Sequence, residues 1–175
     1  MATLTLRPDA GGFNTNFLYS PDGITGYPAD VNENYKQVDE AVADDDANFV
    51  FHSGTQNLDT YNIPDSSPLG VISAVTVYNR AKKFSGTSGQ ASAAIRTYST
   101  NYPGTARTLT ASYVTRSHSW ATNPNTGYPW TWAEINALEI GVYLNPSNAN
   151  LRCTQIYVVI AYTALLSHSQ AHIIG

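Results

Sequence analysis

Apolar and polar residues alternate through most of the second half of the chain, which is the pattern of strands with one buried side. β-Branched and aromatic residues dominate the alternating runs, as strands favour. The runs predict strands at 71–82, 91–99, 108–120, 138–144 and 151–163. Clusters of Gly, Pro, Asn and Ser predict turns between them at 86–89, 101–104 and 145–148.

The first half of the chain has a weaker pattern. Shorter runs predict strands at 3–7, 13–19, 35–39, 48–52 and 58–63. Residues 8–34 are rich in Gly, Pro, Asn and Asp, which predicts a long ordered loop or arm. About eight to ten strands separated by turns, with almost no helix, predict an all-β fold, a jelly-roll-like β-sandwich. An immunoglobulin-like sandwich is the alternative.

One short helical turn is predicted near 132–137. Thr131 and Glu134 fit a capping box, in which each side chain accepts a hydrogen bond from a free backbone N–H of the other. Trp132 and Ile135 are three residues apart, so they share one face of the turn. We interpret this segment as a plug that closes the open end of the sandwich. The plug comprises Trp130, Thr131, Trp132, Glu134, Ile135 and Leu138.

The length of 175 residues predicts a single domain, which we place at 1–164. Residues 165–175 stay apolar, unlike a disordered tail. We therefore expect that this C-terminal extension or the 8–34 arm docks on a neighbouring subunit, and the alternative is that the extension folds back on its own domain. Tyr is enriched at protein interfaces. Assembly contacts are therefore predicted at Tyr19, Tyr27, Tyr35, Leu165, Leu166, Ile173 and Ile174.

Charged residues make up only 13% of the chain, against a typical ~25%. The net charge is −4 and the nine Lys and Arg residues are scattered. Nucleic-acid binding needs clustered positive charge, so no such partner is expected. No run approaches the ~18 apolar residues that span a bilayer, and no signal-peptide pattern is visible. We therefore expect a protein made soluble in the cytoplasm, without a membrane partner.

Motifs that would indicate catalysis are missing from the chain. It has no nucleophile elbow, phosphate loop, dinucleotide fingerprint or His-Glu-x-x-His motif. His118 lies between two serines, but adjacent side chains on a strand point to opposite faces, so no Ser–His pair is expected. Glu134 and Glu139 are the candidate carboxylate pair of a glycosidase, yet Glu134 already has a capping role. We expect a non-enzymatic protein without cofactors.

Two further features have alternative interpretations. Asp44, Asp45 and Asp46, with Asp39 and Glu40 nearby, have the oxygen ligands that calcium prefers. Their spacing does not match an EF-hand loop, so a solvated acidic loop is favoured and no metal site is predicted. Cys153 lies in a predicted strand and is expected to be a buried free thiol.

The aromatic residues around the predicted helical turn could form a sugar-stacking platform, because aromatic rings offer large apolar faces. The residues of this candidate platform are Trp120, Trp130, Trp132, Tyr128 and Tyr143. The alternative is that the Trp side chains are part of the plug, and this second interpretation is the favoured one.

The chain resembles a broad group of phage and prophage-type structural proteins. The matching segments are 2–8, 38–40, 44–46, 59–61, 72–78, 123–127, 130–141 and 154–160. The most distinctive of them reads Trp-Thr-Trp-Ala-Glu-Ile-Asn-Ala-Leu-Glu-Ile-Gly and spans 130–141.

The resemblance implies a β-sandwich displayed on a virus particle, most simply a capsid decoration (cement) protein that stabilises the head. Such a protein would be assembled in the host cytoplasm and reside in the virion. We expect a homo-oligomer, with a trimer favoured, that contacts the major capsid protein or other virion proteins. The pattern contains no catalytic residues. A tail- or fibre-associated protein and a carbohydrate-binding β-sandwich module remain the alternatives.

Overall fold

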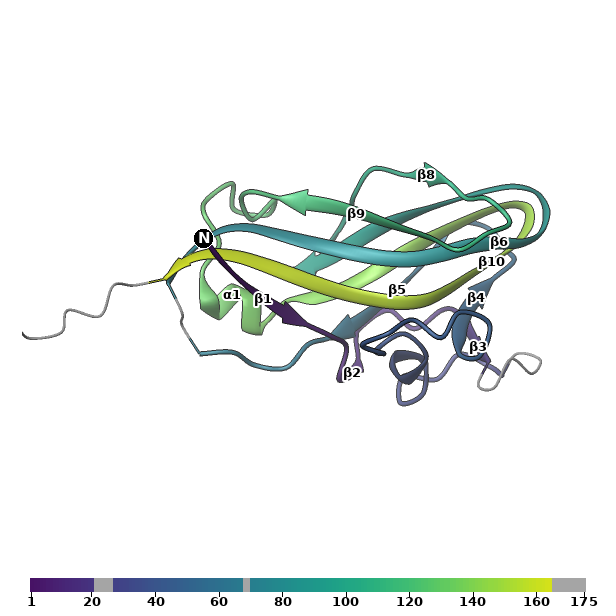
Figure 1. Ribbon diagram of the computed structural model, residues 1–175, viewed down its shortest axis with the longest axis horizontal. Coiled ribbons are helices and arrows are strands. Elements are labelled where there is room, and N and C mark those ends of the chain that lie inside the picture. The colour runs from purple at the N-terminus through teal and green to yellow at the C-terminus, as the bar shows by residue number, and fades with distance from the viewer. Residues whose placement is uncertain (21–26, 68–69, 165–175) are drawn as a thin grey trace, which may run out of the picture.

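Two very long strands, β6 (Gly70–Thr97) and β10 (Glu139–Ala164), organise the fold. They pair antiparallel along almost their whole length, from Glu139 opposite Arg96 to Ala164 opposite Gly70. Figure 1 shows the computed structural model, which describes residues 1–20, 27–67 and 70–164. In it the β6–β10 ribbon bends back on itself, so that one continuous sheet forms both layers of a jelly-roll-like β-sandwich.

The front layer in Figure 1 is sheet I, which contains the first half of β6 and the second half of β10. Strand β9 pairs with β6, strands β1 and β4 pair with β10, and β3 pairs with β4. These strands are β1 (Ala2–Leu6), β3 (Leu18–Ser20), β4 (Phe49–His52) and β9 (Val114–Trp120).

The other layer is sheet II, which contains the second half of β6 and the first half of β10. Strand β5 pairs with β10, β2 pairs with β5, and β7 and β8 pair with β6. These strands are β2 (Ala10–Gly11), β5 (Asn57–Asn62), β7 (Thr100–Pro103) and β8 (Arg107–Thr108). The described residues thus form ten strands in one sheet, which confirms the predicted all-β sandwich.

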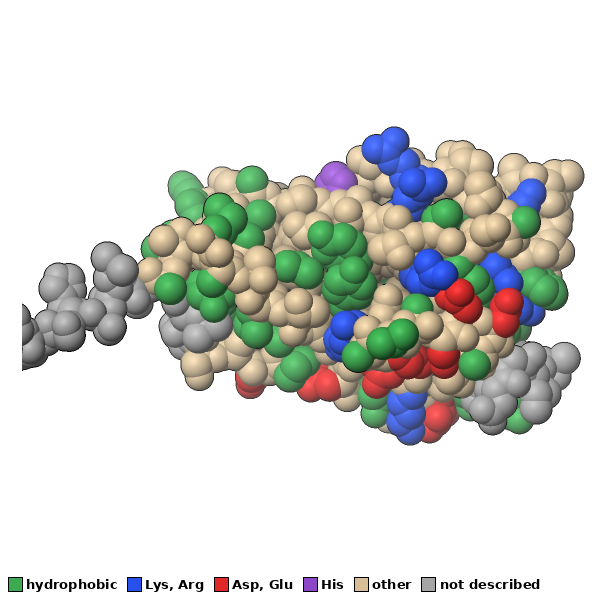
Figure 2. All heavy atoms as spheres, viewed as in Figure 1, with side chains coloured by type: hydrophobic (Ala, Val, Ile, Leu, Met, Phe, Trp, Pro, Cys, Tyr) green, Lys and Arg blue, Asp and Glu red, His purple; other side chains and the backbone are tan. Residues whose placement is uncertain are grey.

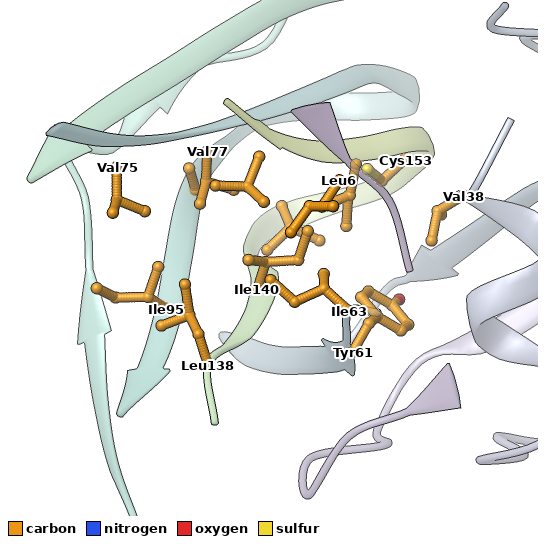
Figure 3. Packing of buried hydrophobic residues seen from close by; sticks show 14 of the residues in the cluster. Leu6, Val38, Tyr61, Ile63, Val75, Val77, Ile95, Leu138, Ile140 and Cys153 are labelled. Atoms are coloured by element: carbon orange, nitrogen blue, oxygen red, sulfur yellow. The ribbon is translucent and has the colours of Figure 1, made fainter. Parts of the chain in front are cut away.

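The hydrophobic core lies between the two layers. Alternate residues of a strand point to opposite faces, and one face of each long strand is mostly apolar, with Asn79 of β6 as a buried polar exception. Ile140, Val142 and Leu144 of sheet II are fully buried, as are Ile156 and Val158 of sheet I. Figure 3 shows side chains from both layers pointing toward one another. Cys153 is a buried free thiol in this core, as predicted, and burial raises its pKa to about 12.

The predicted helical turn is present as α1 (Trp132–Asn136), and both hydrogen bonds of the capping box are present. Trp132 donates from its indole nitrogen to the carbonyl oxygen of Gly70 at 2.7 Å. Trp130 donates in the same way to Trp120 at 3.1 Å. Trp130 and Trp132 are both buried, together with Ile135 and Leu138. The Trp-rich segment therefore packs into the core at this end of the sandwich.

The predicted turns at 86–89 and 145–148 are wrong, because the chain stays extended through both segments. The Gly, Pro, Asn and Ser residues of these two segments instead lie where the β6–β10 ribbon bends. Gly86 has a left-handed backbone there, and the register shifts between Asn150 and Leu151. Pro146 lies opposite Gly89 in the same bend. Glycines and a bulge allow the sharp twist that such a corner needs.

Three other local predictions also differ from the structure. Residues 101–104 are not a turn, because the turn is at Tyr98 and Ser99, both with positive φ. The predicted strand at 35–39 is the 3-10 helix η2 (Asn34–Gln37). The predicted strand at 108–120 is divided into β8 and β9, and of 13–19 only the end is a strand.

The apolar extension at 165–175, with Leu165, Leu166, Ile173 and Ile174, lies outside the described residues. Within the described part of the chain, no helix has the length and apolar character that crossing a membrane would need.

Candidate functional site

The outer face of sheet II presents a row of cross-strand pairs from β6 and β10. Ile140, Val142 and Leu144 point into the core, so the residues between them point outward. The register places Tyr143 opposite Ser92 and Asn145 opposite Gln90. Ser147 lies opposite Ser88 beyond them, at the bend of the ribbon. The outward side chains of this half of the sheet are therefore hydroxyls and amides.

These side chains line two hollows that adjoin each other, because both contain Gln90 and Asn145. The larger hollow has a volume of about 290 Å³ and the smaller about 90 Å³. We call the two hollows together the groove. Its lining residues are Gln56, Ser88, Gly89, Gln90, Ala91, Ser92, Ala106, Thr108, Tyr143, Asn145 and Ser147. None of these lining residues carries a charge at neutral pH.

The groove has one aromatic ring, that of Tyr143. The residue is half-buried, and burial raises the pKa of its phenol further above neutral pH. A neutral phenol can donate and accept hydrogen bonds, and its ring has an apolar face. The groove thus combines an aromatic surface with amides that donate and accept, and it can contact a neutral ligand rich in hydroxyl groups.

The other half of this outer face is crossed by residues 12–16, which we call the strap. Asn14 Nδ2 donates to Oγ1 of Thr60 on β5 at 3.4 Å and to Oδ1 of Asn101 on β7 at 3.2 Å. Strands β10 and β6 lie between β5 and β7, so the strap spans them. Beneath it Gly141 lies opposite Ala94, and both are buried.

An ion pair lies under the same strap. Arg96 donates from Nη1 to Oε1 of Glu139 at 2.6 Å, and both side chains are largely buried. The backbone N–H of Phe13 and the hydroxyl of Thr60 donate to Oε2 of Glu139. The Phe13 ring lies 4.1 Å from the guanidinium carbon of Arg96. Glu139 is therefore held by structural partners, which explains why it is buried although it points outward.

The other candidate catalytic groups are also engaged in structural contacts. Both oxygens of Glu134 are hydrogen bonded, Oε1 to Asn123 and Tyr98 and Oε2 to Thr131. Nδ1 of His118 accepts a hydrogen bond from the Thr105 backbone at 3.2 Å. These contacts give both residues a structural role.

The three consecutive aspartates anchor their loop to sheet I. Asp45 accepts two hydrogen bonds from Arg80, at 2.6 and 2.8 Å. Asp46 accepts from Lys82 at 2.6 Å and from Arg152 at 2.7 Å. The loop is solvated, as predicted, because the Asp46 side chain is 56% exposed, but its ion pairs also fix it to sheet I. Across residues 1–20, 27–67 and 70–164, no group of three His, Cys, Asp or Glu side chains could hold a metal ion.

The structure separates the members of the candidate aromatic platform. Trp120, Trp130 and Trp132 are each at most 8% exposed, so their rings are unavailable for stacking. Tyr128 is 74% exposed but lies outside the groove. Tyr143 is the one member that lines it.

The tyrosines predicted as assembly contacts lie away from the groove lining. Tyr19 and Tyr27 stack on each other with their ring centroids 5.3 Å apart, and Tyr27 is exposed. Tyr35 is half-buried and packs against the core. An assembly role for these residues stays a prediction.

Sequence reasoning missed the rest of the groove. Gln56, Gln90 and Asn145 come from three separate segments of the chain, and 86–89 and 145–148 were interpreted as turns. The signal that could have identified them is the continued alternation of polar residues with Ala91, Ala93 and Leu144 on the apolar face.

Sequence comparisons do not relate this chain to a known group: no protein-family model matches it, and no curated protein does. Solved structures with a similar fold include the xylan-binding module CBM15, at 9% identity and a TM-score of 0.50, over 93% of this chain and 99% of that one. The C-terminal CBM6 of LamC, a laminarinase from Zobellia galactanivorans, has 8% identity and a TM-score of 0.48, over 91% and 100%. The CBM22-1 xylan-binding domain of Paenibacillus barcinonensis Xyn10C has 7% identity and a TM-score of 0.45, over 88% and 86%. At these identities, the likeness to CBM15 is one of fold.

Proposed function

We propose that this protein is a non-enzymatic carbohydrate-binding β-sandwich module that binds a neutral glycan in the groove of sheet II. The observation that carries the proposal is the groove itself, in which Tyr143 lies among Gln56, Gln90, Ser92 and Asn145 without a charged residue. This is the chemistry that suits an uncharged polyhydroxylated ligand.

The amides match the hydrogen-bonding needs of sugar hydroxyls. Each sugar hydroxyl both donates and accepts, and the side-chain amides of Gln90 and Asn145 do the same. These residues project from two paired strands, so their positions are set by the sheet. The ring of Tyr143 supplies an apolar surface for the carbon–hydrogen face of a sugar ring.

The fold is consistent with this proposal but supplies weaker support than the groove. CBM15 is a xylan-binding module, and its fold resembles that of this chain. A shared fold does not by itself establish a shared ligand, because one fold serves many functions. The choice of a glycan ligand therefore rests on the side chains, and xylan enters as a suitable first probe.

An array of neutral and acidic oligosaccharides, probed with the wild-type chain and with Tyr143→Ala, tests the proposal. We expect binding to neutral glycans, lost in Tyr143→Ala and retained in the matched control Tyr128→Ala. Tyr128 is exposed and lies outside the groove, so this control removes an aromatic ring without altering the groove. If the wild-type chain binds no neutral glycan on the array, the proposal is contradicted.

A second candidate function is a structural role on a virus particle, as a decoration or tail-associated protein. Its support is the resemblance described above and the outer face of sheet I. Tyr78 and Tyr157 stack there with centroids 4.7 Å apart, and Val159 and Ala161 of the same face are only half-buried. Figure 2 shows hydrophobic side chains among polar ones on the side of the molecule that presents sheet I.

In this second function sheet I would face the major capsid protein or another copy of the chain, with a trimer favoured, in a virion assembled in the host cytoplasm. Mass spectrometry of purified particles is the test. Many copies of the chain per particle would support the structural role, and absence of the chain from particles would exclude it.

A further inference from the structure

Building on the proposed function, we propose that the groove binds the free end of a neutral glycan chain rather than its interior. The reason is that the strap closes one end of the groove. A glycan chain that lies along β10 cannot continue past Tyr143 without meeting the strap.

The closed end is the strap. Along β10 the outward residues run from Ser147 through Asn145 and Tyr143 to Gly141, with successive positions about 7 Å apart. The lining of the groove includes Tyr143 but not Gly141. Gly141 is buried where Asn14 joins Thr60 to Asn101, so the polar floor ends at Tyr143.

The strap is a fixed barrier because several bonds hold it. The backbone N–H of Gly12 donates to Thr60 at 2.9 Å, and that of Thr60 donates to Asn14 at 2.9 Å. Phe13 donates from its N–H to Glu139 at 2.8 Å. Asn16 Nδ2 donates to the Leu58 carbonyl at 2.7 Å. A glycan that continued along β10 would have to break this set of contacts.

Residues outside β6 and β10 line the two sides of the groove. Gln56, just before β5, lines one side, and Ala106 and Thr108, around β8, line the other. The end opposite the strap differs, because Ser88 and Ser147 at the bend of the ribbon are exposed. The glycan would therefore enter over these serines and place its terminal sugar against Tyr143.

The experiment measures how many protein molecules a polysaccharide can bind. Soluble xylan and soluble mixed-linkage β-glucan are each prepared intact and partially hydrolysed, at equal total mass. Binding at chain ends predicts a capacity that rises in proportion to the number of ends, several-fold for a several-fold shortening. A capacity that follows the mass of polymer and ignores the number of ends would overturn the inference while leaving the proposed function intact.

Cyclic β-glucans supply the matched control, because they have the same sugars as a linear β-glucan but no chain ends. We expect the linear oligosaccharide to bind and the cyclic one to show at least a tenfold weaker affinity. Equal affinity for the two would overturn the inference. Binding neither to these probes nor to any neutral glycan of the array would contradict the proposed function itself, so the two failures are distinguishable.

Discussion

Gln90 and Asn145 lie directly opposite each other on neighbouring strands, and both hollows of the groove are lined by this pair. The pair is therefore the centre of the site. Two facing amides present four N–H donors and two acceptor oxygens at one position of the sheet, which is an arrangement that can contact adjacent hydroxyl groups of a sugar.

The central pair leads to a first prediction. Gln90→Ala and Asn145→Ala should each weaken binding of a neutral oligosaccharide about tenfold, or ~1.4 kcal/mol, because each removes hydrogen bonds to the ligand. Isothermal titration calorimetry measures the loss. The double variant should lose less than the sum, since the two side chains act on one part of the ligand.

Asn125→Ala is the control for these variants. Asn125 is exposed, donates to the Tyr102 hydroxyl at 2.9 Å, and lies outside the groove. It should leave affinity unchanged. A loss in Asn125→Ala equal to that in Gln90→Ala would show that the effect is not specific to the groove.

Glu40 leads to a prediction about pH. Burial raises the pKa of its carboxyl to about 7 from an ordinary 4.5, with nearby Asp44 adding to the effect. The folded state therefore binds the proton more tightly than the unfolded state. The free energy that protonated Glu40 contributes to folding is fully present below pH 4.5, and it is lost as the pH rises through 7. Glu40→Gln should remove this loss and stabilise the protein at pH 8 by about 1–2 kcal/mol.

Chemical denaturation at pH 5 and pH 8 measures the effect as a difference between wild type and variant. The comparison with the variant is needed because Asp46 changes the stability of the wild type with pH in the opposite direction to Glu40. Burial opposes its ionisation, but hydrogen bonds from Lys82 and Arg152 outweigh burial and lower its pKa. Glu33→Gln, at a surface carboxylate paired with Lys36, is the control. Equal behaviour of the two variants at pH 8 would contradict this account of Glu40.

The capping box of α1 gives a third prediction. Thr131→Ala should lower the free energy of unfolding by about 1 kcal/mol, because the hydroxyl that accepts from the Glu134 N–H is lost. Glycan affinity should be unchanged, since Thr131 does not line the groove. Urea denaturation compares it with Thr122→Ala, an exposed threonine outside the helix. A large loss of binding would move the functional site toward α1.

The bend of the ribbon gives a fourth prediction. Gly86 has φ +91°, and a Cβ there would collide with the Asn148 carbonyl oxygen. Gly86→Ala should therefore destabilise the protein by about 2 kcal/mol or more. Gly127 also has a positive φ, +74°, but no atom lies within 4 Å of its added Cβ. Gly127→Ala should cost only about 1 kcal/mol, and equal losses in a melting experiment would exclude the collision as the cause.

Local signals allowed part of this structure to be predicted from the sequence. The Thr131–Glu134 cap is a contact between near neighbours, so its pattern is visible in the chain. Alternation identified the buried face of β10 at Ile140 and Val142 for the same reason. The bend was missed because Gly86 and Pro146 belong equally to a hairpin turn and to a sharp corner. Only long-range pairing decides between these outcomes.

The groove was missed for a related reason. Gln56 and Gln90 are polar residues in separate segments, and only the pairing of β5, β10 and β6 brings them to one face. Tyr143 was included among the candidate aromatic residues, but with three Trp side chains that pack into the core. Burial of these rings depends on tertiary contacts such as the bond from Trp132 to Gly70.

The most direct test of the central claim is to locate the bound glycan by NMR. Titration of the labelled protein with a neutral oligosaccharide should shift the side-chain amide signals of Gln90 and Asn145 and the signals of Tyr143. Signals of Tyr128 and of the Tyr78–Tyr157 stack on sheet I should stay in place. Shifts confined to sheet I or to the loop around Tyr128, with the groove unchanged, would contradict the assignment of the groove as the binding site.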